Sequence, residues 1–96
     1  MAWVYILHAA AHNKYYVGFS TIDPQERLER HNQGYYEDKF TSRYKPWILF
    51  FSIKCNSDIQ ARSIEKYIKS MKSSVYINNL KQYPEMSAKL LERFKS

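Results

Sequence analysis

The chain has 96 residues, of which 45% are hydrophobic, 17% aromatic and 25% charged, and its formal net charge is +6 at pH 7. This length fits a single domain over residues 1–96 and leaves no room for a second one. No apolar run approaches the roughly 18 consecutive residues of a membrane span, and the N-terminus lacks the pattern of a signal peptide. We therefore expect a cytoplasmic protein with no membrane partner.

The positive charge favours an anionic partner, because lysine and arginine displace counterions from phosphates. Nine tyrosines add aromatic faces that suit contact with nucleic acids, although a basic surface that only maintains solubility is the alternative. Cys55 is the only cysteine, which excludes an internal disulfide and a multi-thiolate zinc site. Because it ends an apolar run over residues 48–55, we expect it to be a core residue rather than a nucleophile.

The first two elements are predicted to be strands. Residues 3–7 and 15–19 are rich in β-branched and aromatic side chains, which are typical of strands. The connection over residues 9–14 is short enough for a hairpin, so the two strands are expected to be antiparallel neighbours.

A helix is predicted over residues 23–33. Asp23 is a good N-cap, Pro24 suits the first helical position, and Glu26 completes a capping box. Gly34 supplies the left-handed residue that ends the helix.

The segment over residues 35–46 has little periodicity and is predicted to be a functional loop. A strand follows at 48–54, apolar enough for a central place in the sheet. Ser57 and Gln60 form a capping box that opens a helix reaching about residue 72.

A final helical region covers residues 75–80 and 87–94, with an interruption near Pro84. The predicted order is strand, strand, helix, strand, helix, helix. This order favours an α+β fold with a small three-stranded, mainly antiparallel sheet flanked by helices.

Three polar residues are candidates for a catalytic or metal-binding site. Arg27 and His31 are four residues apart and lie on the same face of their helix, which is more often just a solvated surface. Glu65 follows an apolar helix position and lies at the edge of the core, or it forms an exposed ion pair with Lys69 worth only about 0.3–0.5 kcal/mol. A single carboxylate needs substrate phosphate and water to complete a metal site, as is common for Mg²⁺.

Five segments follow one another at suitable spacing: Trp-Val-Tyr at 3–5, Tyr-Val-Gly at 16–18, and the stretches 26–34, 39–47 and 61–69. Together they resemble the GIY-YIG endonuclease family, in particular its small stand-alone members. Trp3 replaces the first glycine of the family motif, and valine replaces isoleucine in both strand motifs. Residues 73–75, Ser-Ser-Val, stand where relatives are often rich in lysine and arginine.

The resemblance implies a metal-dependent endonuclease that hydrolyses phosphodiester bonds in DNA, structure-dependent or weakly sequence-specific, in DNA repair or recombination. It implies that Glu65 holds Mg²⁺ or Mn²⁺ and that Arg27 binds the non-bridging phosphate oxygens. Tyr5 and His31 would share the activation of water, in an order that the sequence leaves open, while Tyr16 would position Tyr5 or a phosphate.

Other basic and polar residues are expected to contact the nucleic acid. The expected partner is DNA, with RNA as the alternative, together with a recruiting protein, and the chain would act as a monomer or weak dimer. Two competing interpretations are a catalytically silent nucleic-acid-binding module and an RNA-binding or ribosome-associated protein. The expected contacts are Thr41, Arg43, Lys45, Lys69 and Lys72.

Overall fold

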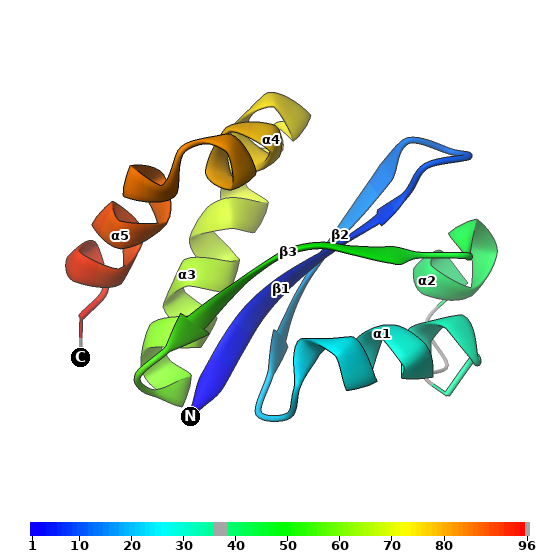
Figure 1. The fold of residues 1–96 in the computed structure, drawn as a ribbon, viewed down its shortest axis with the longest axis horizontal. Coiled ribbons are helices and arrows are strands. Elements are labelled where there is room, and N and C mark those ends of the chain that lie inside the picture. Colours follow the sequence, from blue (N-terminus) through cyan, green and yellow to red (C-terminus); the bar gives the residue numbers. More distant parts are fainter. Residues whose placement is uncertain (36–38, 96) are drawn as a thin grey trace.

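Three antiparallel strands form a sheet in the order β2-β1-β3, and helices cover both of its faces in the computed structural model, which describes residues 1–35 and 39–95 (Figure 1). The α+β class and the antiparallel hairpin are as predicted. The prediction of a central place for the strand at 48–54 is wrong, because among the described residues this strand pairs only with residues 2–9 and lies at an edge of the sheet. No helix in these two ranges is long and apolar enough to cross a membrane. The elements are β1 (Ala2–Ala9), β2 (Lys14–Ser20), α1 (Pro24–Asn32), α2 (Lys39–Tyr44), β3 (Ile48–Cys55), α3 (Asp58–Met71), α4 (Ser74–Gln82) and α5 (Pro84–Arg93).

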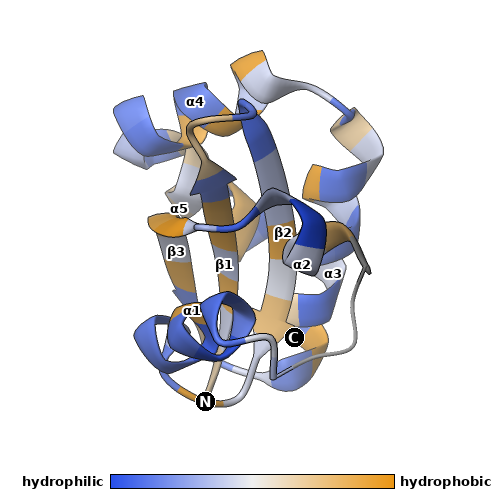
Figure 2. Cartoon of the chain, turned by 90° about the vertical axis from the view of Figure 1, so that its right-hand side faces the viewer, coloured by the Kyte–Doolittle hydropathy of each residue, from blue (hydrophilic) through white to orange (hydrophobic). Residues whose placement is uncertain are grey.

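The sheet separates two cores of different chemistry. Side chains alternate between the two faces of a strand, so neighbouring residues of β1 enter different cores. Val4 and Ile6 pack in an aliphatic core with α3, α4 and α5, which includes Ile64 and Leu80. The other core lies beneath α1 and is partly aromatic, with Tyr5, Leu7, Ala9, Leu28 and Trp47 as its buried members. Figure 2 shows the sheet from the side on which α1 and α2 lie, and α1 is mostly hydrophilic in this view.

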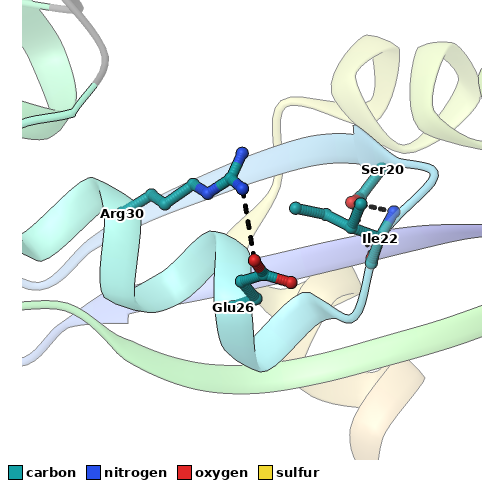
Figure 3. Close-up of polar contacts among 4 residues, drawn as sticks. All are labelled: Ser20, Ile22, Glu26 and Arg30. Carbon is teal, nitrogen blue, oxygen red and sulfur yellow. Dashed lines mark hydrogen bonds and ion pairs between the residues drawn. The ribbon is translucent and has the colours of Figure 1, made fainter.

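The turn between β2 and α1 fixes where α1 begins. The hydroxyl of Ser20, which is fully buried, accepts a hydrogen bond from the Ile22 N–H at 3.0 Å and donates to the Ile22 carbonyl at 2.7 Å (Figure 3). Along the helix, Glu26 and Arg30 form an exposed ion pair at 3.2 Å, visible in the same view. Such a pair contributes only a few tenths of a kcal/mol, so the buried Ser20 contact is the firmer constraint on the direction of α1.

The caps of α1 agree with the sequence in position but differ in one detail. The Asp23 carboxylate accepts from the Gln25 N–H at 2.8 Å, rather than from the third helical residue of a full capping box. Gly34 follows the helix with a φ of +74°, a left-handed conformation that glycine adopts without strain. The prediction of a helix over residues 23–33 is therefore confirmed to within its capping residues.

The prediction of a loop over residues 35–46 is wrong for its second half, while residues 36–38 lie outside the described ranges. Lys39–Tyr44 form the short helix α2. Its aromatic residues pack on one another, with the rings of Phe40 and Tyr44 5.1 Å apart and those of Phe40 and Trp47 5.8 Å apart. A helix this short is not stable from propensity alone, so tertiary packing that periodicity does not reveal explains it.

The C-terminal region contains two helices rather than one interrupted helix. Pro84 is the first residue of α5, where its missing N–H has no cost. Before it, Ser73 caps α4 by accepting from the Tyr76 N–H at 3.1 Å. The Gln60 side chain joins α3 to α5 by donating to the Leu91 carbonyl at 2.8 Å. Pro84 thus begins a new helix instead of interrupting one, which corrects the prediction of a single interrupted helical region.

Candidate functional site

The phenol ring of Tyr5 extends from the central strand β1 across the edge strand β2. Tyr5 pairs with Gly18 on β2, and a Cβ atom added to Gly18 would lie 2.5 Å from Tyr5 Cζ and 2.6 Å from its hydroxyl oxygen. No real Cβ atom approaches so closely, so the absence of a side chain at position 18 creates the space for the phenol. Gly18 thereby lets Tyr5 deliver its hydroxyl over the edge strand.

Tyr5 and His31 form a buried polar pair. The Tyr5 hydroxyl and His31 Nε2 lie 2.9 Å apart, and their residues are 0% and 2% exposed. The hydroxyl and the imidazole satisfy each other's hydrogen-bonding capacity, whereas either group buried alone would lower the stability of the fold. Either group is able to donate, depending on the imidazole tautomer, so the pair is suited to passing a proton.

Tyr16 completes an aromatic cluster around this pair. Its ring centroid lies 5.0 Å from that of His31 and 6.2 Å from that of Tyr5. Phe40 of α2 and Trp47 also approach Tyr16, each with ring centroids 6.4 Å away. Tyr16 is half-buried, so it lies nearer to solvent than the buried pair that it contacts.

Arg27 holds a positive charge beside the Tyr5 ring. Its guanidinium carbon lies 5.4 Å from the ring centroid, within the range of a cation–π interaction. The residue lies one turn before His31 on α1 and is partly exposed. A guanidinium in this position can present a planar fork to a phosphate.

Glu65 approaches from the opposite face of the sheet. It belongs to α3, which packs against β1 and β2, and its side chain is 20% exposed. Oε2 forms an ion pair with Lys69 Nζ at 3.0 Å, which is the alternative that the spacing in the sequence left open. Lys69 in turn lines a surface cavity together with Tyr16, so α3 reaches the aromatic cluster around the β2 edge.

The basic and polar residues that are expected to bind nucleic acid lie at the surface, with one exception. Arg43, Lys45, Lys69 and Lys72 are exposed. Thr41 is 1% exposed, and its carbonyl accepts a hydrogen bond from Trp47 Nε1 at 2.8 Å. The side chain of Thr41 is therefore buried in this conformation, and its contact with nucleic acid stays a prediction.

Cys55 is 2% exposed, and its thiol donates weakly to the Ile53 carbonyl at 3.6 Å. Burial raises the pKa of the thiol above its ordinary value, which keeps it protonated near neutral pH. The residue behaves as a small core side chain, as predicted.

Three residues of this region had no assigned role in the sequence analysis. Gly18 makes room for Tyr5, and Phe40 packs beside Tyr16. Asn32 joins α1 to β3: its amide donates to the Trp47 carbonyl at 2.9 Å and accepts from the Trp47 N–H at 2.7 Å. Gly18 is marked in the sequence by its place in the Tyr-Val-Gly segment and as a glycine inside a strand pattern, whereas only tertiary structure reveals the pairing of Asn32 with Trp47.

The chemistry of the donor set is compatible with a divalent metal at Glu65. Among the described residues, no three His, Cys, Asp or Glu side chains gather as a metal cage. Mg²⁺ is commonly bound by one or two carboxylates, with water and substrate phosphate as its other ligands. A partly exposed carboxylate at a basic edge meets this requirement only when phosphate is present, which fits a metal that binds together with its substrate.

A guanidinium, a Tyr–His pair and a carboxylate beside surface lysines can neutralise charge, position a nucleophile and stabilise a leaving group, as hydrolysis of a phosphate ester requires. This set of groups is compatible with a hydrolase acting on phosphate esters. The family model for the GIY-YIG catalytic domain matches residues 1–81 of the sequence. The chain therefore belongs to this family of metal-dependent endonucleases. Its substrate is accordingly a nucleic acid. The chain matches no curated protein and no solved structure.

Proposed function

We propose that the protein cleaves phosphodiester bonds in DNA with weak sequence preference and a dependence on DNA structure, in repair or recombination. The observation that carries this proposal is the buried hydrogen bond of 2.9 Å between Tyr5 and His31, with the Arg27 guanidinium 5.4 Å from the Tyr5 ring. An acid–base pair and a phosphate clamp are thereby combined at one edge of the sheet.

The roles divide according to exposure. Arg27 and Tyr16 are partly exposed and meet the scissile phosphate first, Arg27 by binding its non-bridging oxygens. Tyr5 and His31 are buried, so the side chains around them must move before water reaches the pair. Apo active sites often tighten or rearrange only around the substrate.

Proton transfer follows the hydrogen bond. With His31 Nε2 unprotonated, the Tyr5 hydroxyl donates to it and can pass its own proton to the imidazole while it accepts one from the attacking water. The hydroxide formed attacks phosphorus, and the 3′ oxygen departs on the opposite side. The positive charge of Arg27 near the ring offsets negative charge that develops on the Tyr5 oxygen during this transfer.

Glu65 is the residue that would hold the divalent metal, either Mg²⁺ or Mn²⁺. When bound, this ion supplies Lewis-acid neutralisation of negative charge on the departing oxygen. Lys69 must release the Glu65 carboxylate at that stage, since an ammonium 3.0 Å from a carboxylate oxygen competes with a cation for it.

The test uses purified protein with supercoiled plasmid, flap and branched DNA in the presence of Mg²⁺ or Mn²⁺. Glu65→Gln and Arg27→Lys should lower the rate by about 100-fold or more, because each removes one group that stabilises the transition state. Glu92→Gln, an exposed carboxylate change on α5, is the matched control and should keep its activity.

Circular dichroism and thermal melting must show that each variant is folded. Cleavage that survives Glu65→Gln would contradict the assignment of this residue and indicate a contaminating nuclease. DNA binding without cleavage by the unaltered protein would contradict the enzymatic proposal and support a silent nucleic-acid-binding module.

A further inference from the structure

A surface cavity of about 360 Å³ borders the candidate site at the β2 edge, where α3 ends and α4 begins. Its size is at the lower end of the range of small-molecule sites, about 300–1,000 Å³. Tyr16 belongs both to its lining and to the aromatic cluster around Tyr5 and His31. A molecule in the cavity would therefore be next to a group bound by Arg27 and Tyr16.

One part of the lining is aromatic and aliphatic. Tyr15, Tyr16 and Val17 contribute from β2, while Ile68 and Ile77 contribute from α3 and α4. Such a surface suits a nucleobase and its sugar, since bases stack on aromatic rings without regard to their identity.

The other part is cationic and rich in hydroxyl groups. Lys69 and Lys72 are exposed at the end of α3, and Ser73 and Ser74 open α4. Ammonium groups form charge-assisted hydrogen bonds with phosphate oxygens. The start of α4 adds the positive end of a helix dipole to the same side.

The aromatic part is preorganised. The Tyr15 ring stacks on His8 with a centroid distance of 4.4 Å and an interplanar angle of 17°. Its hydroxyl accepts a hydrogen bond from Asn78 Nδ2 at 3.0 Å, and Asn78 also donates to the Ser74 carbonyl at 2.7 Å. Binding then requires little ordering of this side of the cavity, which favours affinity.

A second cavity of about 360 Å³ between α3 and α5 provides an internal comparison. Lys66 lines it, three residues before Lys69 on the same helix. None of the residues that line this second cavity borders Tyr5 or His31. It therefore has the same volume as the cavity at the β2 edge but does not adjoin the candidate site.

We propose that the cavity at the β2 edge takes one unpaired nucleotide of the substrate strand, next to the scissile phosphate. This inference rests on the proposed function and specifies its substrate class. Extracting a base from a duplex costs a few kcal/mol, and the cost is smallest where the base is already unpaired. Substrates with a mismatch, bulge or flap junction at this position are therefore preferred over continuous duplex.

Binding is tested first without metal, so that cleavage plays no part. ¹⁵N-labelled protein is titrated with deoxyadenosine monophosphate, deoxyadenosine and inorganic phosphate. We expect the nucleotide to bind most tightly and to shift the amide signals of residues 15–17 and 72–77. Lys72→Gln should weaken nucleotide binding by about 3- to 10-fold, whereas Lys66→Gln should not change it.

Phosphate that binds as tightly as the nucleotide would overturn the proposal, because only an anion site would then be present. Shifts that are absent or spread over the whole surface would overturn it as well. Unchanged binding by Lys72→Gln would exclude the cationic side of the cavity from recognition.

Cleavage separates this inference from the proposed function. Duplexes with and without a single unpaired nucleotide are compared, and the unpaired one should be cut at least about 10-fold faster. Equal rates would overturn the nucleotide cavity and leave the nuclease proposal intact. Absence of cleavage in all substrates would refute the nuclease, while specific mononucleotide binding would still support the cavity as a nucleotide site.

Discussion

The two faces of the sheet differ in what they bury. The face under α3, α4 and α5 is filled with aliphatic side chains such as Val4, Ile6 and Leu80. The face under α1 and α2 is smaller and contains Tyr5 and Trp47, with buried His31 beside them. One face contributes most of the hydrophobic burial, whereas the other holds the groups that we propose bind phosphate and transfer protons, with Glu65 added from α3.

This division has a physical reason in a chain of 96 residues. A domain of this size has little buried area to spare, so polar groups in its main core would be costly. Concentrating them on the smaller face leaves the aliphatic core intact. Neighbouring residues of β1 can then contribute to the aliphatic core or to the candidate site, because their side chains point to opposite faces of the sheet.

The largest effect on stability is expected from Leu80→Ala in the aliphatic core. Leu80 is 0% exposed, and its truncation should cost about 2–5 kcal/mol of unfolding free energy, measured by urea denaturation. The folded fraction should cleave DNA at close to the unaltered rate. Leu28→Ala on the other face should lower both stability and the rate. Equal losses of rate per folded molecule in the two variants would break the comparison.

Gly18→Ala tests the close approach between β2 and Tyr5. The added methyl group should cost about 1–3 kcal/mol, because it would lie 2.5 Å from Tyr5 Cζ. Its unfolding penalty should largely disappear in a Tyr5→Ala background, where the ring is gone. Penalties that simply add in this double-mutant cycle would show that the ring does not lie over Gly18.

Lys69→Gln tests the competition for the Glu65 carboxylate. Removing the ammonium should raise the affinity for Mn²⁺ about two- to five-fold, as measured by calorimetry in the presence of a non-cleavable DNA. Lys66→Gln, one residue after Glu65, is the charge-matched control. An unchanged affinity in Lys69→Gln, or an equal rise in both variants, would argue against metal binding at Glu65.

The smallest effect concerns Cys55 and alkaline pH. Burial raises the pKa of its thiol in the folded state, so below the unfolded pKa of about 8.5 both states are protonated and stability is unaffected. Above that pH the unfolded state loses the proton first, and stability falls until the pH passes the folded pKa. Urea melts at pH 7 and 9.5 should show a smaller decline for Cys55→Ala than for the unaltered chain.

Local sequence signals predict the strands and the α1 caps, because strand formation and helix capping depend on residues that are neighbours in the chain. Asp23 and Gly34 act through the backbone of their own helix. The short helix α2 was missed because Phe40, Tyr44 and Trp47 stabilise it through packing between segments.

The candidate site was predicted as a set of residues, not as an arrangement. Spacing placed Arg27 and His31 on one helical face, and the family resemblance added Tyr5. The sequence contained no sign that Gly18 opens the space for the phenol, or that Thr41 is enclosed. Both depend on contacts between residues far apart in the chain, which no local pattern encodes.

The most direct test compares Tyr5→Phe with Ile6→Val, two neighbours on β1 that face opposite sides of the sheet. The measurement is the rate of metal-dependent DNA cleavage per folded molecule, with folded fractions taken from urea melts. Tyr5→Phe should lower the rate by about 100-fold or more while Ile6→Val leaves it nearly unchanged, although both lose about 0.5–1.5 kcal/mol of stability. Similar rates in the two variants would contradict the assignment of reaction chemistry to the α1 face.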